Sequence, residues 1–496
     1  MFRRVLVANR GEIAIRVIRA CRELGIQSVA VYTDVDRAAP HAAAADLALP
    51  VGAPPAYLDG PALVRAAVSA GADAVHPGYG FLAENAAFAA ACADAGLAFI
   101  GPPPRAIADM GSKIASRAHA AAAGVSVVPG EAPGQDLPDI AGAASRVGYP
   151  VLVKASAGGG GKGMRVVREP RELAEAVQGA RNEAGAAFGD ATLYLERLLQ
   201  RPRHVEVQVF GDAHGQVVHL FERDCSIQRR HQKIVEESPS PALPPALRRQ
   251  MGEAAARIAR QIGYRSAGTV EFLVEAGDEG PRFYFLEMNT RLQVEHPVTE
   301  AVLGVDLVHA QIRVAAGEPL PWRQEDLVQR GHAIECRIYA EDPEAGFLPQ
   351  AGRLAIYREP AAPGVRVDSG AAEGGEVSVY YDPLLAKLIA HGETRESARL
   401  RALAALRRYA ILGIRTNVPF LVRVLEHPAF RAAAIDTGFL DQHEELARPP
   451  EHPPAIAAAV AAAAVHDAPA RVEAAAAGTG AADPWDRLSR WGRSAL

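Results

Sequence analysis

The 496-residue sequence contains only four cysteines: Cys21, Cys92, Cys225 and Cys336. None of them forms a Cys-x-x-Cys pair, which argues against both a disulfide framework and a thiolate zinc site and suits a reducing compartment. Long apolar runs are also missing, because none approaches the ~20 residues needed to span a bilayer. The start of the chain reads as a strand rather than a signal peptide. We therefore expect a cytoplasmic protein without a membrane segment.

The sequence has no excess of positive charge. Its 53 lysines and arginines are outnumbered by 58 acidic residues, which gives a net charge of −5. This balance argues against a surface built to bind nucleic acid. A hydrophobic content of 49% with 22% charged residues is ordinary for a globular protein. A chain of 496 residues exceeds one hydrophobic core, so we expect two to four domains.

The two common glycine motifs of nucleotide binding give little support here, because the tract at 158–163 formally fits Gly-x-Gly-x-x-Gly only as any glycine tract does. Residues 3–33 read as strand, helix and strand, which implies a parallel sheet. The turn at residues 8–12 lacks the dinucleotide glycine spacing, so we assign it a structural role. The tract at 158–163 is not a P-loop, because Gly163 follows Lys162 where serine or threonine is required.

The glycine tract at 158–163 nevertheless lies between two strand-like runs. Its exposed backbone N–H groups suit phosphate oxygens, and Lys154 on the preceding strand would add a positive charge. Strand, glycines and strand together describe a flap over phosphates. The alternative is a mobile hairpin tip with no ligand.

The stretch at 287–296 is the one around which the chain is organised. It follows the strand-like run 283–286, and residues 269–274 form a second such run that would pair with it as a hairpin. Glu271 would then face Glu287, and two facing carboxylates repel unless a cation lies between them. Asn289 and Arg291 share the face of Glu287. This set suits a hard cation beside a bound anion, whereas the simpler interpretation is a solvated strand end with an ion pair.

Other segments leave two interpretations open. The charge-dense run 222–233 is either a solvated basic surface or part of an anion site, and it lacks the interleaved aromatics of a nucleic-acid platform. Lys113 alone would be taken for a surface residue, and His76 for a packing residue. Arg337 shares a strand face with Glu335, so an ion pair alone would explain it. Residues 302–316 are expected to form one helix.

The segment Glu287–Glu300, with the letters EMNTRLQVEHPVTE, resembles the metal-binding and catalytic segment of biotin carboxylases in the ATP-grasp superfamily. The similarity extends from Met1 to about Leu440 and looks closest to the biotin carboxylase part of acyl-CoA carboxylase α subunits. It implies an α/β and α+β multidomain fold. The implied domains are a Rossmann-like N-terminal (pre-ATP-grasp) domain at 1–112, an ATP-grasp domain at 113–320 with a flexible glycine-flap lid at about 130–205, a C-terminal biotin carboxylase domain at 331–442, and a Pro/Ala-rich linker and tail at 443–496.

The resemblance also implies an activity, which is the carboxylation of biotin by bicarbonate and ATP through carboxyphosphate. The implied nucleotide contacts are Lys113, Lys154, Gly160, Gly161, Glu196, Arg197, Leu199, His204, Gln228, His231, Glu271 and Glu287. Two Mg²⁺ or Mn²⁺ ions are implied on Glu271, Glu287 and Asn289. The implied bicarbonate and biotin contacts are Lys233, Arg291, Gln293, Val294 and Arg337. The catalytic set is Arg291, Glu295 as general base, Lys233 and Arg337.

Partners follow from the same resemblance. Biotin is normally attached within Met-Lys-Met, and no methionine here is next to a lysine. We therefore expect biotin to be supplied in trans on a carboxyl carrier protein or domain, together with a carboxyltransferase subunit and a homodimeric state. Two alternatives are a different ATP-grasp ligase, whose ATPase would ignore biotin, and a non-enzymatic scaffold, which would show decay at chemical positions.

Overall fold

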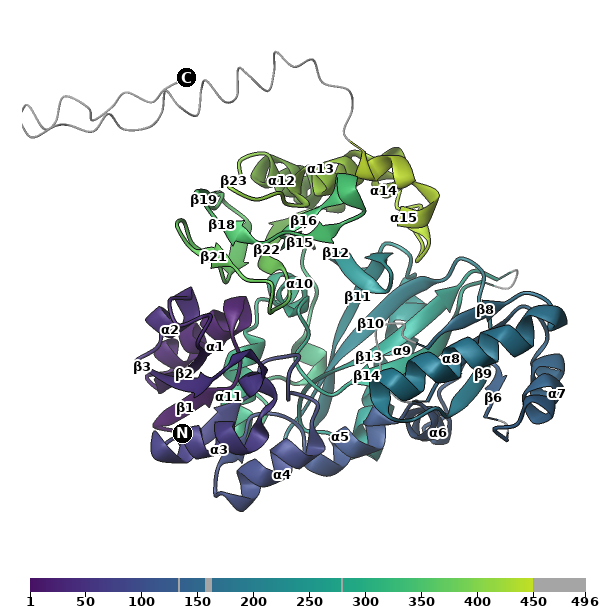
Figure 1. Cartoon of the computed structure of the whole chain (residues 1–496), viewed down its shortest axis with the longest axis horizontal. Helices are drawn as coiled ribbons and strands as arrows, with labels where there is room; N and C mark the ends of the chain where they lie inside the picture. Colours follow the sequence, from purple (N-terminus) through teal and green to yellow (C-terminus); the bar gives the residue numbers. More distant parts are fainter. Residues whose placement is uncertain (133, 157–162, 278–279, 449–496) are drawn as a thin grey trace, which may run out of the picture. The chain divides into compact units, whose positions relative to one another are not determined.

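The computed structural model describes residues 1–132, 134–156, 163–277 and 280–448. Gly160 and Gly161 lie outside these residues. The N-terminal region contains a five-stranded parallel sheet of order β3-β2-β1-β4-β5 (Figure 1). Its strands are β1 (Arg4–Val7), β2 (Gln27–Thr33), β3 (Leu47–Gly52), β4 (Ala74–His76) and β5 (Ala98–Phe99). Its helices are α1 (Gly11–Glu23), α2 (Pro40–Ala44), α3 (Gly60–Ser69) and α4 (Ala86–Asp94).

Local sequence explains where these N-terminal elements begin. The side chains of Asp59 and Asn85 accept hydrogen bonds from the first turns of α3 and α4, as N-cap residues do. The strand, helix and strand expected in residues 3–33 are β1, α1 and β2, so this prediction is confirmed. His76 is buried and its Nδ1 accepts a hydrogen bond from the Gly78 N–H, as expected of a packing residue.

A smaller four-stranded sheet of order β6-β9-β7-β8 follows. Its strands are β6 (Gly130–Glu131), β7 (Val151–Ala155), β8 (Arg165–Val167) and β9 (Leu193–Arg197). It is preceded by α5 (Pro104–Gly111) and α6 (Lys113–Ala122). Helices α7 (Leu137–Val147) and α8 (Leu173–Phe188) share one hydrophobic cluster with this sheet. Figure 1 shows α8 running beside its strands.

The largest sheet has eight antiparallel strands in the order β14-β13-β10-β11-β12-β15-β22-β20. They are β10 (Arg203–Gly211), β11 (Val217–Arg229), β12 (Gln232–Ser238), β13 (Ser266–Glu275), β14 (Arg282–Asn289), β15 (His332–Tyr339), β20 (Val365–Ser369) and β22 (Leu384–Gly392). The expected hairpin is β13 and β14, with Glu271 directly opposite Glu287. The pairing of β12 with β15 continues the sheet from the expected ATP-grasp domain, which ends at residue 320, into the expected C-terminal domain, which begins at residue 331.

Three helices accompany the first strands of this sheet: α9 (Pro245–Gln261), α10 (His296–Leu303) and α11 (Leu307–Ala315). The single helix expected over residues 302–316 is therefore wrong. Gly304 ends α10 in a left-handed conformation with φ 69°, and the Asp306 side chain caps α11. A glycine with positive φ ends one helix, and an acidic N-cap residue after it begins the next, so the two together mark a break between helices.

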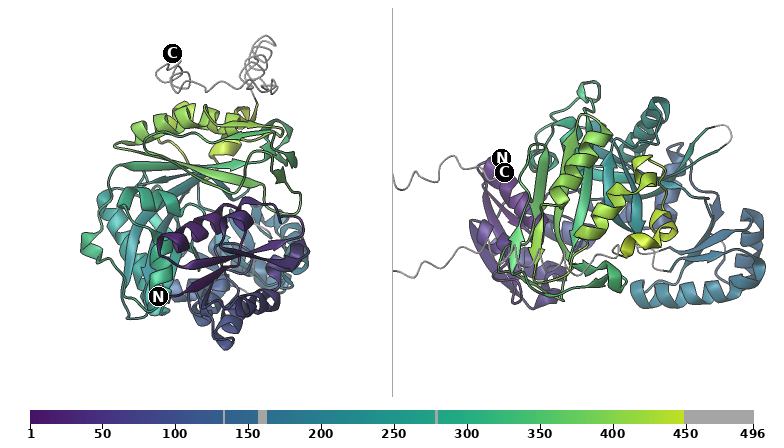
Figure 2. Two further views of the ribbon diagram at one scale, coloured as in Figure 1. Left: turned by 90° about the vertical axis from the view of Figure 1, so that its left-hand side faces the viewer. Right: turned by 90° about the horizontal axis from the view of Figure 1, so that it is seen from above.

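The C-terminal helices are α12 (Arg395–Leu406), α13 (Val418–Glu426), α14 (Pro428–Arg431) and α15 (Phe439–Gln442). Figure 2 shows helices of this region lying over one face of the large sheet, and buried residues of α12 and α13 share a core with β15 and β22. Two-stranded ladders join β16 (Glu341–Asp342) to β17 (Leu348–Pro349), β18 (Gly352–Arg353) to β21 (Glu376–Val377), and β19 (Ile356–Arg358) to β23 (Ala410–Leu412).

Single 3-10 turns complete the described chain: η1 (Pro54–Leu58), η2 (Pro170–Glu172), η3 (Gln324–Asp326), η4 (Pro343–Ala345) and η5 (Glu444–Ala447). Among the described residues, no helix combines the length and the apolar character that crossing a membrane requires.

Asn417 links α13 by hydrogen bonds to β15, the strand that carries Arg337. Its Nδ2 donates to the Arg337 carbonyl at 2.9 Å, and its Oδ1 accepts from the Tyr339 N–H at 2.8 Å. The side chain is 1% exposed, so water cannot replace these bonds. A buried backbone group that loses its partner costs about 1–3 kcal/mol.

We therefore expect Asn417→Ala to destabilise the protein by about 1–3 kcal/mol. Thermal unfolding compared with the wild type measures this loss. The control is Asn182→Ala, which removes an exposed asparagine of α8 and should change stability by less than about 0.5 kcal/mol. Equal thermal unfolding midpoints for the two variants would contradict the stabilising role assigned to the Asn417 side chain.

Candidate functional site

A cleft of about 1190 Å³ lies where N-terminal loops, the four-stranded sheet and the eight-stranded sheet meet. The predicted site residues that line it are Lys113, Lys154, Glu196, Arg197, Leu199, His204, Gln228, His231, Lys233, Glu271, Glu287, Asn289, Arg291, Gln293, Val294 and Arg337. Glu295 lies behind this lining and is 0% exposed. The structure thus gathers residues that are far apart in the sequence into one cleft, while their individual roles stay predictions.

Lys233 is the centre of the deepest part of the site. Its Nζ donates to one carboxylate oxygen each of Glu206 at 2.5 Å, Glu271 at 2.8 Å and Glu295 at 2.7 Å. Burial alone would lower the pKa of Lys233, but these three carboxylates raise it well above its ordinary value. Lys233 is therefore a fixed positive charge in this arrangement.

Glu295 is held by two cations. One oxygen accepts from Lys233, and the other accepts from Arg337 Nη2 at 2.9 Å. Burial would raise the pKa of Glu295, but Lys233 and Arg337 together hold it well below its usual range. Arg337 also donates to Glu236 at 2.6 Å, and burial raises the pKa of Glu236 to about 7 despite that arginine. Arg337 therefore pairs with carboxylates of other elements rather than with Glu335 on its own strand.

An oxygen-rich group lies beside this cluster, in the middle of β13 and at the end of β14. Glu271 and Glu287 are cross-strand partners, and Asn289 Nδ2 donates to Glu271 at 2.8 Å. Asn289 Oδ1 accepts from Arg291 at 3.1 Å, and the Glu287 carboxylate is 3.6 Å from Lys113 Nζ. Carboxylate and amide oxygens are the donors that Mg²⁺ and Mn²⁺ prefer. The residues present therefore fit a hard divalent cation.

His204 supports the acidic group from β10. Its Nε2 lies 2.9 Å from Glu271. Burial would lower the pKa of His204, but Glu271 raises it overall. Gln228, His231 and Lys233 come from the β11–β12 hairpin, in which Gln228 is the cross-strand partner of Lys233. Most of the charge-dense run at 222–229 is buried strand, so a wholly solvated basic surface is wrong there.

Lys154 and Glu196 form a second buried pair in the cleft, on neighbouring strands of the small sheet. Lys154 Nζ donates to Glu196 at 2.9 Å, and Arg117 pairs with the other oxygen of the same carboxylate. Burial would lower the pKa of Lys154, but the Glu196 carboxylate favours the charged form, and the pKa is raised overall. A charged lysine on a strand beside the cleft suits nucleotide phosphates.

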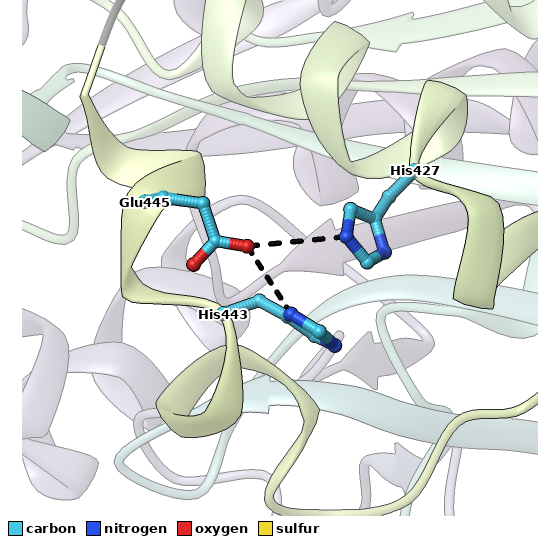
Figure 3. A group of neighbouring side chains, drawn as sticks. All are labelled: His427, His443 and Glu445. Carbon is cyan, nitrogen blue, oxygen red and sulfur yellow. Dashed lines mark hydrogen bonds and ion pairs between the residues drawn. The ribbon is translucent and has the colours of Figure 1, made fainter.

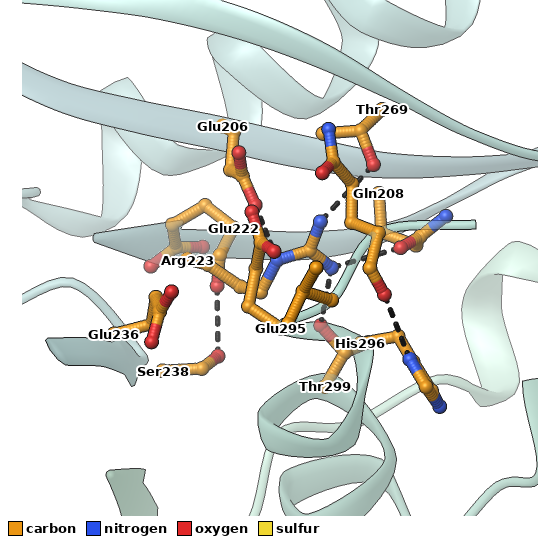
Figure 4. A network of polar contacts seen from close by, with 12 residues as sticks. Glu206, Gln208, Glu222, Arg223, Glu236, Ser238, Thr269, Glu295, His296 and Thr299 are labelled. Atoms are coloured by element: carbon orange, nitrogen blue, oxygen red, sulfur yellow. Dashed lines mark hydrogen bonds and ion pairs between the residues drawn. The ribbon is translucent and has the colours of Figure 1, made fainter. Parts of the chain in front are cut away.

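Sequence reasoning missed the residues that contact the site side chains from the side away from the cleft. Arg223 is 0% exposed and donates to Glu206 at 2.6 Å, so it fixes the carboxylate that supports Lys233 (Figure 4). It also bonds to Gln208, Thr269 and Thr299. The strand alternation placed Glu206 on the face of His204 and Gln208, but nothing in the sequence identified its partners.

Glu84 is a second missed residue. Its carboxylate accepts from Arg291 Nε at 2.8 Å and from the Thr290 N–H at 2.9 Å. Glu84 therefore orients Arg291, which follows strand β14. In the sequence, Glu84 looks like part of a helix start. Only the fold brings it next to Thr290 and Arg291, which are 206 and 207 positions away.

Comparisons with known proteins match three domains along the chain. Residues 1–107 match the biotin carboxylase N-terminal domain, residues 112–323 the ATP-binding domain of the carbamoyl-phosphate synthase L chain, and residues 335–442 the biotin carboxylase C-terminal domain. A biotin carboxylase of Halalkalibacterium halodurans is 50% identical over 447 residues, which cover 89% of this chain and 98% of that protein. The α subunit of mitochondrial methylcrotonoyl-CoA carboxylase from Glycine max is 52% identical over 446 residues.

The match to the Glycine max subunit covers 89% of this chain but 61% of that protein, so the chain spans less than two thirds of such relatives. Among solved structures, the biotin carboxylase domain dimer of Hydrogenobacter thermophilus 2-oxoglutarate carboxylase, in complex with MgADP, ADP and bicarbonate, superposes with a TM-score of 0.88. It is 47% identical and covers 91% of this chain and 100% of that one. The three matched domains, together with a relative that is 50% identical and covered over 98% of its length, show that the chain belongs to the biotin carboxylase family of ATP-dependent ligases.

Proposed function

We propose that the chain carboxylates biotin: ATP, bicarbonate and biotin give ADP, phosphate and N-carboxybiotin, with carboxyphosphate as intermediate. The observation that carries this proposal is the buried cluster of Lys233, Glu295 and Arg337 at the back of the cleft. Bicarbonate is a poor electrophile, so it must first be activated by phosphoryl transfer. Catalysis of that transfer is mainly positioning and charge neutralisation, which fixed cations supply.

ATP would occupy the side of the cleft formed by the small sheet. Lys113, Lys154 and the glycine segment with Gly160 and Gly161 would contact its phosphates. Residues near the adenine and ribose would be Glu196, Arg197, Leu199, His204, Gln228 and His231. Two Mg²⁺ or Mn²⁺ ions would be held by Glu271, Glu287 and Asn289, and when bound they neutralise phosphate charge. Lys113, 3.6 Å from the Glu287 carboxylate, already neutralises part of this acidic group, and Arg291 donates to the Asn289 amide oxygen.

Bicarbonate would lie between Lys233 and Arg291, beside Gln293 and the backbone of Val294. Gln293 supports this placement, because its Nε2 is buried beside the cleft with no hydrogen-bond partner among the described residues. An anion oxygen there would accept its N–H. Glu295 would be the general base. Bicarbonate would draw on the charge of Lys233, and the weakened pairing would make Glu295 a stronger base when substrate is present.

Carboxyphosphate would then release CO₂ beside biotin. The liberated phosphate would remove the proton from the ureido nitrogen, and the enolate-like negative charge that develops would be stabilised by Arg337. Arg337 is suited to this role because Glu236 and Glu295 fix its guanidinium from two sides. We propose that biotin arrives in trans on a carrier protein or domain.

We also propose that the chain is a component of an acetyl-CoA or other acyl-CoA carboxylase, with a carboxyltransferase partner. The similarity to methylcrotonoyl-CoA carboxylase α subunits supports this assignment. A homodimer is proposed because the Hydrogenobacter relative is described as a domain dimer.

The first experiment is ATP hydrolysis with Mg²⁺ and bicarbonate, with and without free biotin. We expect biotin to stimulate phosphate release, because its carboxylation removes the intermediate. Hydrolysis that is indifferent to biotin would indicate another ATP-grasp ligase. Bound ATP without any hydrolysis would indicate an inactive scaffold.

Glu295→Gln should reduce biotin carboxylation by about 10²–10⁴-fold while ATP still binds, because an amide cannot take the bicarbonate proton. Bicarbonate-dependent turnover and nucleotide binding measure the two effects. The matched control is Glu237→Gln, which changes another buried glutamate that pairs with His332 and Arg395 away from the cleft. Undiminished carboxylation in Glu295→Gln would remove the base assignment.

Glu287→Gln should raise the Mg²⁺ concentration needed for half-maximal activity by at least about tenfold, since one ligand charge is lost. Its side chain is 31% exposed and its carboxylate lies 3.6 Å from Lys113 Nζ, so little folding energy depends on it. Titration of activity with Mg²⁺ gives the shift. The control Glu253→Gln lies on an exposed position of α9 and should titrate like the wild type. Coincident curves for all three proteins would argue against Glu287 as a metal ligand.

A further inference from the structure

Two imidazoles and a carboxylate converge outside the cleft, near the end of the described chain (Figure 3). His427 caps α14, His443 follows α15, and Glu445 lies in η5. Glu445 Oε1 is 3.2 Å from His443 Nδ1 and 3.9 Å from His427 Nε2. The two imidazole centroids are 4.2 Å apart.

These separations are close to those of a metal coordination sphere. Zinc binds histidine nitrogen and carboxylate oxygen at about 2.0–2.2 Å, so ligand atoms in a tetrahedron are about 3.3–3.6 Å apart. The observed distances of 3.2 and 3.9 Å lie on either side of this range. The Glu445 side chain is 66% exposed, so it can adjust without disturbing the core.

The surroundings favour coordination over simple ion pairing. Within the described part of the chain, both ion pairs of the Glu445 carboxylate are with imidazoles. The comparable group of Glu23, Asp306 and His309 differs, because Asp306 there is already paired with Arg16 at 2.7 Å. A neutral imidazole has one ring nitrogen whose lone pair can coordinate a metal ion.

The supporting elements hold the three side chains in place. Phe439 is 2% exposed and its ring packs against both imidazoles, with centroid distances of 5.6 Å to His427 and 4.9 Å to His443. Arg423 Nε donates to the Leu446 carbonyl at 2.7 Å, which fixes the turn that carries Glu445. Preorganised ligands lose less freedom when the ion binds.

Two hydrogen bonds have to change. His443 Nδ1 lies 3.2 Å from Glu445 Oε1, and because an ionised carboxylate only accepts, the Nδ1 proton must move to Nε2 when Nδ1 coordinates the ion. The Ala429 N–H donates to His427 Nδ1 at 3.3 Å, so the proton of the neutral ring is on Nε2. Coordination through Nε2 moves that proton to Nδ1 and breaks this hydrogen bond. The bond is long, so the loss is small.

We propose that His427, His443 and Glu445 form a binding site for a borderline divalent ion, Zn²⁺ above all, with the fourth position open to water. Two nitrogen ligands select Zn²⁺ over the Mg²⁺ expected in the cleft. The ion would join α14 to the segment after α15. Thr437, Gly438 and Asp441 of this region line the cleft, so the bound ion also steadies one cleft wall.

The test uses the metal-stripped full chain, titrated with Co²⁺ in saturating Mg²⁺ and ADP, which occupy the cleft. We expect one equivalent of Co²⁺ with visible absorption of tetrahedral intensity, displaced by Zn²⁺. His443→Ala should lose this equivalent. Glu445→Gln should bind at least about tenfold more weakly, because even outer partners of metal ligands are worth that much. Circular dichroism confirms that each variant is folded.

Glu444→Gln is the matched control, since Glu444 is an exposed acid on the same turn but outside the cluster. It should bind Co²⁺ like the wild type. Zn²⁺ should also raise the thermal midpoint of the wild type and of Glu444→Gln, but not that of His443→Ala. Failure of the wild type to bind, or an equal equivalent in folded His443→Ala, would overturn the proposal.

Discussion

The charge of Lys233 is the constraint on which the site depends. The Lys233 side chain is 11% exposed, and the carboxylates of Glu206, Glu271 and Glu295 compensate the charge of its ammonium from three different elements. Each carboxylate then needs further cations. Glu206 has Arg223, Glu271 has His204, and Glu295 has Arg337. The result is an alternating network of charges that forms only when the strands of the large sheet come together.

Such a network also explains why Glu295, the proposed base, has a low proton affinity in this arrangement. Removing one partner from a buried charge network leaves the others uncompensated, at a cost of about 3–5 kcal/mol. The protein therefore keeps every member paired, and an incoming anion competes with carboxylates for the same cations. In the proposed function, the binding of bicarbonate and the change in the proton affinity of Glu295 would both result from this competition.

Much of the hairpin could be predicted because strand alternation is a local signal. Residues 269–274 and 283–286 indicate two strands that pair as a hairpin. The exact partner of Glu271 is set by a register shift between Glu271 and Phe272, which places Glu287 opposite it. The partners of Arg337 could not be predicted this way. Glu236 is 101 positions away in the sequence, and the contact depends on β12 pairing with β15. Lys113 and the nucleotide contacts came from the family resemblance, since a lysine at a helix start has no distinctive pattern.

The unbroken pairing from β14 to β20 has a consequence for how this chain can be divided. Family matches end at residue 323 and resume at residue 335, as if two modules met there. In the structure, however, β12 and β15 are hydrogen-bonded neighbours. Cutting the chain between them would leave two long strand edges with open donors and acceptors, which are templates for intermolecular β-pairing. Recombination at this point would yield aggregating fragments, so the ATP-binding and C-terminal parts are obliged to be inherited together.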